Sequence, residues 1–181
     1  MGFTLLEMLL ALALGLVFSG VLVQVLLVQG RQGALLVRLL RERSFQRRTI
    51  ELVRADLQRA DWLQLGQASG AACSLVGRDP VLQISTTMGP ITYTVGPPPS
   101  PIWRGKVLMR CGPAFGLDGE PSEGEAQNRV VIDSLPAGGF RAESSGFGRL
   151  RLGLLQQFTL PDGTTQRIET AVELAGLVTP R

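Results

Sequence analysis

The segment "GFTLLEMLLALALG", residues 2–15, is almost entirely apolar, yet it carries a carboxylate at Glu7. The apolar run continues to Val28 and is interrupted only by Thr4, Glu7, Ser19 and Gln24. A helix over this run reaches about 39 Å, which exceeds the roughly 30 Å hydrocarbon core of a bilayer. The run is also longer than the apolar region of a cleaved signal peptide. The sequence therefore predicts a membrane-spanning helix over residues 3–30.

The carboxylate of Glu7 is unusual in this setting. An acidic side chain at the centre of a membrane helix is penalised by roughly 2.5–3.5 kcal/mol, so such residues tend to have a function. A plainer alternative is that Glu7 lies close enough to the chain start to reach water. Both interpretations stay open from the residues alone.

The helical pattern continues beyond the apolar run. Residues 31–65 contain no proline, and apolar residues recur at spacings of three and four: Leu36, Leu39, Leu40, Ile50, Val53, Leu57 and Ala60. This spacing predicts an amphipathic helix over 31–65. Gly30 and Gly33 lower its local stability and mark a point where it could bend or melt.

Arginines dominate the polar face of this second helix segment. Arg43, Arg47 and Arg54 share that face with Glu51, which favours a solvated surface with ion pairs at helical spacing. A nucleic-acid contact is the alternative, because duplex binding needs several phosphate contacts on one surface.

The composition changes after residue 65. "GQASGAAC", residues 66–73, reads as a loop, and the first proline is Pro80. The later segments alternate between apolar and polar residues, which predicts strands at 81–86, 91–95, 102–111, 129–133, 150–160 and 165–174. The last two segments form a hairpin with one buried face. We expect an α+β fold in which a long N-terminal helix packs on an antiparallel sheet domain at 66–181.

The composition gives little support to an enzyme. The chain has no histidine, the commonest general base and a frequent metal ligand. Acidic residues gather in "DGEPSEGEAQ", residues 118–127, but their spacing does not match an EF-hand loop, and a solvated acidic loop is expected. We therefore expect no catalytic residue, no cofactor and no metal site.

The string Gly-Phe-Thr-Leu-Leu-Glu at residues 2–7 resembles the N-terminus of type IV pilins and type II secretion pseudopilins. The resemblance implies cleavage by prepilin peptidase after Gly2, leaving residues 1–2 as a residual leader. It also implies N-methylation of the new terminal Phe3 and pairing of Glu7 with a neighbouring subunit's terminal ammonium during assembly. The segments "VRADLQRAD", "ITYTV" and "VLMRC" look like those of the larger minor pilins of the W type and the J-type pseudopilins.

The resemblance also implies a location and partners. The chain would be a single-pass protein of a bacterial inner membrane, with a periplasmic domain, and would later enter a type IV pilus or a secretion pseudopilus. Its partners would be other pilin or pseudopilin subunits, prepilin peptidase, the inner membrane assembly platform and the lipid bilayer. An alternative function is binding at a filament tip, for DNA uptake or for adhesion, with DNA as the partner in the first case.

The two cysteines gain a context from this location. An oxidising compartment outside the cytoplasmic membrane favours a disulfide between Cys73 and Cys111. Two unpaired buried thiols are the alternative, because pairing geometry cannot be read from sequence. A metal site is disfavoured, since two cysteines without histidine do not complete a tetrahedral ligand set.

Overall fold

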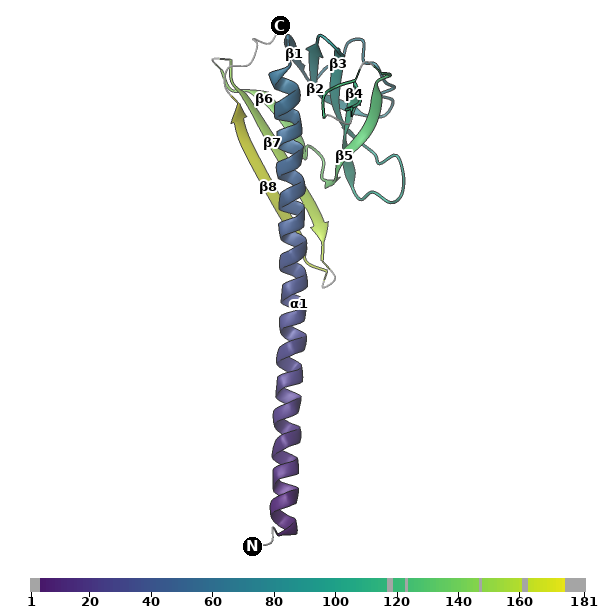
Figure 1. The fold of residues 1–181 in the computed structure, drawn as a ribbon. Coiled ribbons are helices and arrows are strands. Elements are labelled where there is room, and N and C mark those ends of the chain that lie inside the picture. Colours follow the sequence, from purple (N-terminus) through teal and green to yellow (C-terminus); the bar gives the residue numbers. More distant parts are fainter. Residues whose placement is uncertain (1–3, 117–118, 123, 147, 161–162, 175–181) are drawn as a thin grey trace. The chain divides into compact units, whose positions relative to one another are not determined.

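The computed structural model describes residues 4–116, 119–122, 124–146, 148–160 and 163–174. Within these residues a single helix, α1 (Leu5–Gln58), precedes the strands (Figure 1). The strands are β1 (Trp62–Leu65), β2 (Asp79–Thr86), β3 (Gly89–Gly96), β4 (Lys106–Gly112), β5 (Gln127–Leu135), β6 (Phe140–Ser144), β7 (Leu150–Thr159) and β8 (Thr165–Leu174). The protein is thus an α+β chain with an apolar N-terminal helix and an antiparallel β domain. It divides into two compact units, Met1–Glu42 and Arg43–Arg181.

The first unit contains the apolar part of α1. Leu5–Leu27, a stretch of 23 residues, is long and apolar enough to cross a membrane, and none of it is buried within the chain. Leu5 is 77% exposed and Phe18 is 67% exposed. The helix continues through Gly30 and Gly33, the point at which the sequence indicated that it could bend or melt.

The second half of α1 is shorter than the sequence predicted. The amphipathic helix was expected to reach residue 65, but α1 ends at Gln58, and Trp62–Leu65 forms strand β1. The amide of Asp61 donates to the carbonyl of Ser85 at 2.9 Å, so the chain joins β2 as soon as the helix ends. The apolar spacing behind the prediction ends at Ala60, and the absence of proline before Pro80 left no local signal for the change to a strand.

The strands form two antiparallel sheets rather than one. One sheet has five strands in the order β1-β2-β3-β4-β5, and the other has three in the order β6-β7-β8. The predicted C-terminal hairpin is the β7–β8 pair, which runs in register from Leu150↔Leu174 to Thr159↔Thr165. Strand β6 was not predicted. Apolar Phe140 and Ala142 alternate with polar residues over only five positions, and Phe140 is the one fully buried side chain in the strand, so the sequence signal is weak.

One stripe of the helix in the second unit packs against both sheets. Ile50, Val53 and Leu57 are at most 3% exposed and belong to the same core cluster as residues from the two sheets. The five-stranded sheet contributes Leu82, Ile84, Ile91, Tyr93 and Leu108, and the three-stranded sheet contributes Phe140, Leu152 and Leu154. Burying each large apolar side chain stabilises the fold by roughly 1.5–3 kcal/mol.

A buried glutamine fixes the helix against the last strand. The side-chain amide of Gln46, which has no exposed surface, donates to the carbonyl of Ile168 at 2.9 Å. The hydroxyl of Thr170 donates to the Gln46 side-chain oxygen at 2.7 Å. Both ends of the amide are therefore satisfied by β8, as burial of a polar group requires.

The structure joins Cys73 and Cys111 in a disulfide, the pairing that the sequence favoured, with Cα atoms 6.0 Å apart. Cys111 lies in β4, and Cys73 lies in the loop between β1 and β2. The same loop is also held by Gln83, whose side chain bonds both the amide and the carbonyl of Ser69. The loop is thus fixed to the five-stranded sheet at two points.

We expect a Cys73→Ser, Cys111→Ser variant to lose about 4 kcal/mol of unfolding free energy, because the disulfide closes a loop over a separation of 38 residues. Unfolding in detergent micelles measures this loss. Mass spectrometry should show no alkylated thiol in the wild-type protein unless it is first reduced. Alkylation of both cysteines without reduction would contradict the pairing.

Candidate functional site

The first candidate site is the start of α1. Thr4 precedes the first helical residue, and Glu7 lies three positions later. The backbone amide of Thr4 donates to Oε2 of Glu7 at 2.9 Å, and the Thr4 hydroxyl donates to the same oxygen at 3.0 Å. The amide of Glu7 lies 3.4 Å from the Thr4 hydroxyl oxygen in the reciprocal contact. These contacts form a capping box.

The capping box explains how an acidic residue can begin an apolar helix. The first amides of a helix lack intrahelical partners. They also form the positive end of the helix dipole, which favours a nearby carboxylate. Glu7 accepts a hydrogen bond from one of those amides, that of Thr4, so the contact is made within the first turn. Sequence reasoning missed this role, although the signal, a threonine three residues before a glutamate, was present. Gly2 and Phe3, the predicted cleavage and methylation residues, lie outside the described residues.

The second candidate site is a buried ionic cluster at the end of α1. Asp56 has no exposed surface and accepts two hydrogen bonds from Arg110. Nε donates to Oδ2 at 2.7 Å, and Nη2 donates to Oδ1 at 3.1 Å. The hydroxyl of Tyr93 donates to Oδ2 at 2.6 Å. Helix α1 and strands β3 and β4 each supply one of these side chains. The carboxylate is thereby neutralised and hydrogen-bonded on both oxygens.

Burial and charge shift the protonation of this cluster. Burial raises the pKa of Tyr93 well above its usual value, and the adjacent Asp56 charge adds to that shift. Burial alone would lower the pKa of Arg110, but the hydrogen bonds and charge of Asp56 outweigh it, so its pKa is raised. The site therefore holds a neutral phenol beside a fixed ion pair. Because these side chains come from three different elements, the cluster is suited to holding the elements together.

Arg110 also orders the loop that follows β4. Its Nη1 donates to the carbonyl of Pro113 at 2.8 Å, and its guanidinium lies 4.7 Å from the centre of the Phe115 ring. Phe115 in turn forms a bridge with Pro121. A single guanidinium thus links the helix end, the sheet and this loop.

The three residues of the cluster come from the segments on which the branch resemblance was based. Asp56 lies in "VRADLQRAD", Tyr93 in "ITYTV" and Arg110 in "VLMRC". The sequence marked the segments but did not indicate that these side chains meet. No periodicity argument could show it, because the residues are 37 and 54 positions apart from Asp56.

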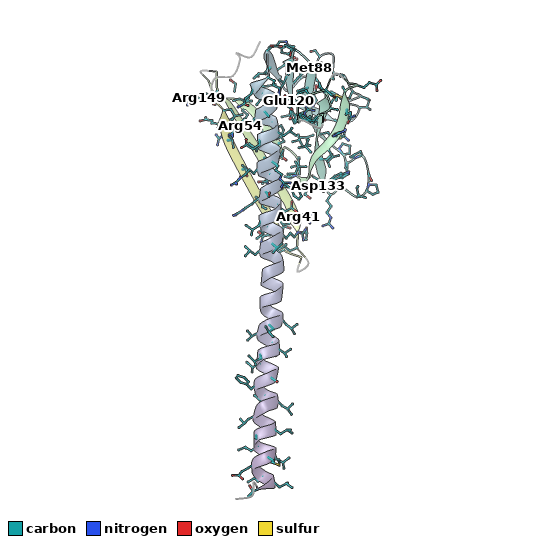
Figure 2. The ribbon with its side chains drawn as sticks, in the orientation of Figure 1. Arg41, Arg54, Met88, Glu120, Asp133 and Arg149 are labelled. Atoms are coloured by element: carbon teal, nitrogen blue, oxygen red, sulfur yellow. A yellow bond between two sulfur atoms is a disulfide. The ribbon has the colours of Figure 1, made fainter. Side chains whose placement is uncertain are left out.

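Glu120, in the described part of the acidic loop, forms an ion pair with Arg59. Oε2 of Glu120 lies 2.8 Å from Nη2 of Arg59, which follows the last residue of α1. Glu120 is labelled in Figure 2. Asp118 and Glu123 lie outside the described residues, and Glu125 is exposed. Among the residues that the structure describes, no three acidic or cysteine side chains are grouped as metal ligands.

Comparison of the chain with protein families, with curated proteins and with solved structures found no match.

We expect Asp56→Asn to lower the unfolding free energy by about 3–5 kcal/mol, because it leaves the Arg110 charge buried without its counter-ion. Urea unfolding in micelles measures the change. Glu51→Gln is the matched control, since it removes a carboxylate from an exposed pair with Arg54 on the same helix. That change should cost less than about 1 kcal/mol. Equal losses in the two variants would contradict the role given to Asp56.

We expect the stability of the folded chain to fall at alkaline pH through Tyr93. An unfolded tyrosine releases its proton near pH 10, whereas the folded one keeps it to a higher pH. The contribution is therefore complete below about pH 10 and is lost as the pH rises from there through the folded pKa.

Tyr93 is the only tyrosine in the chain, so tyrosinate absorbance reports on it alone. In the folded protein this signal should appear only at the pH at which the domain unfolds. Tyr93→Phe should remove its share of the alkaline dependence. Ionisation of Tyr93 near pH 10 without unfolding would contradict the burial argument.

Proposed function

We propose that this chain is a minor pilin or pseudopilin subunit. In this proposal a membrane-anchored precursor is processed by prepilin peptidase and then assembles into a type IV pilus or a secretion pseudopilus. The observation that carries the proposal is the start of α1: the pilin-like string at residues 2–7 places Glu7 in a capping box at the first turn of an exposed apolar helix.

The exposed apolar surface supports two successive environments. The side chains of Leu5–Leu27 are drawn along the first part of α1 in Figure 2, and none of this stretch is buried. A surface of this size is not stable in water and marks a membrane or protein contact. A bilayer would cover it in the precursor, and the helices of neighbouring subunits would cover it in a filament.

The capping box gives Glu7 a mechanism in assembly. Cleavage after Gly2 would make Phe3 the new terminus but would keep the peptide amide of Thr4, which donates to Glu7. Both bonds from Thr4 reach Oε2, so Oε1 is the oxygen suited to a neighbour's terminal ammonium.

In a low-dielectric filament core this ion pair is stronger than in water. An unpaired buried carboxylate is costly there, so an incoming subunit is stabilised only in the register that pairs it.

The second unit supports a domain outside the cytoplasm. The Cys73–Cys111 disulfide suits the oxidising space beyond the inner membrane. The buried pair of Asp56 with Arg110 fastens the helix end to the domain. Together these features support a periplasmic domain that would travel with the helix when a subunit leaves the membrane.

DNA binding receives less support. A groove of about 460 Å³ beside β8 is lined by four arginines, Arg43, Arg47, Arg54 and Arg167. Glu51 and Glu169 line the same groove, and Glu51 pairs with Arg54 at 2.9 Å. Carboxylates among the arginines repel a phosphate backbone, so this surface is a poor match for DNA.

We expect Glu7→Leu to enter the membrane and be processed normally but to fail in assembly. The variant leaves a neighbour's ammonium unpaired in the filament core, which costs about 3–5 kcal/mol at each contact. Immunoblots of sheared filaments measure assembly, and N-terminal sequencing of the membrane fraction measures processing. Gln24→Leu is the matched control, because it removes a second exposed polar side chain from the same apolar helix.

The proposal predicts a methylated phenylalanine at the mature terminus of the wild-type protein and of both variants. Filaments of Glu7→Leu at the wild-type level would contradict the assembly role of Glu7. A mature chain that still begins with Met1 would contradict the processing step and the proposed function with it.

A further inference from the structure

A second groove lies on the other side of the same helix segment. It has a volume of about 330 Å³ and is formed by α1, the loop after β4 and strand β5. The residues that define its character are Arg48 and Leu52 of α1, Ala114 and Phe115 of the loop, and Arg129 and Val130 of β5. All of these residues belong to the second unit.

The walls of this groove are apolar and held in place. Leu52, Phe115 and Val130 are half-buried, so each shows part of its side chain to the groove. The loop wall is fixed by Arg110, which bonds the Pro113 carbonyl and lies against the Phe115 ring. The β5 wall is fixed by antiparallel pairing with β4. Because the groove is already ordered, little conformational entropy would be lost from it when a partner binds.

The charges of the groove are of one sign. Arg48 on the helix and Arg129 on β5 are both exposed. Arg110 also lines the groove, but Asp56 neutralises it. The described lining residues include no aspartate or glutamate, in contrast to the groove beside β8. The groove thus combines apolar walls with two positive charges that have no carboxylate beside them in the lining.

We propose that this groove binds a peptide segment of a partner protein in which an aspartate or glutamate lies next to an aliphatic or aromatic side chain. The apolar side chain would contact Leu52 and Phe115, and the carboxylate would pair with Arg48 or Arg129. Its volume is at the lower end for ligand sites, which suits one or two side chains. An apolar anchor beside a charged contact is a common arrangement at binding hot spots. This inference concerns the second unit and does not depend on filament assembly.

The test selects random peptides displayed on phage against the full chain in neutral phosphatidylcholine nanodiscs. The expected result is a set of peptides that share an acidic residue adjacent to an apolar one. Arg48→Glu and Arg129→Glu should each weaken the binding of a consensus peptide by about tenfold, measured by fluorescence anisotropy. The matched control is Arg43→Glu, Arg47→Glu, which makes the same charge change on the other face of the helix and should change affinity by less than about twofold.

Two further variants separate recognition from misfolding. Ala114→Trp fills the groove without changing charge and should also abolish binding, while thermal unfolding shows that the domain stays folded. When the double variant Arg48→Glu, Arg129→Glu is the target of the phage selection, the selected peptides should instead carry lysine or arginine beside an apolar residue. Failure to enrich any peptide, enrichment of peptides without carboxylates, or equal binding by the wild-type and Ala114→Trp proteins would each overturn the proposal.

Discussion

The buried carboxylate of Asp56 is the constraint on which the second unit depends. Without its partners it would cost several kcal/mol, which is a large share of the roughly 5–15 kcal/mol that stabilises a typical domain. Its two oxygens accept from Arg110 and Tyr93, so the helix end, β3 and β4 must come together in one arrangement. A helix rotated by one residue would move Asp56 by about 100° and lose all three bonds. The cluster therefore fixes the rotation of the helix as well as its position.

The sequence predicted those features that depend on local composition and period. The run over Leu5–Leu27 is apolar on all sides, whereas the later helix is apolar on one stripe, and this difference separates an exposed span from a packed segment. The β7–β8 hairpin was also predicted, with nearly the same bounds, because Leu150, Leu152 and Leu154 alternate cleanly. In each case neighbours in the chain carry the signal.

Other features depend on residues distant in sequence, and these were missed. The residues of β1 were predicted as helix because no proline interrupts 31–65, whereas their pairing with β2 decides the structure. Strand β6 has one buried apolar residue and is stabilised by its pairing with β7. The division into two sheets likewise has no local signal. The capping box is different, since the spacing of Thr4 and Glu7 was visible and was interpreted only in terms of assembly.

The bond between Gln46 and β8 has a consequence for solubility. β8 is an outer strand of the three-stranded sheet, and such strands can recruit strands from other molecules into uncontrolled aggregates. Gln46 occupies the Ile168 carbonyl, and the exposed charges of Arg167 and Glu169 stand on the same strand. In a chain proposed to polymerise through its helix, this protection keeps the β domain from polymerising through its sheet. If the chain polymerises as proposed, its ordered growth would then compete with fewer disordered alternatives.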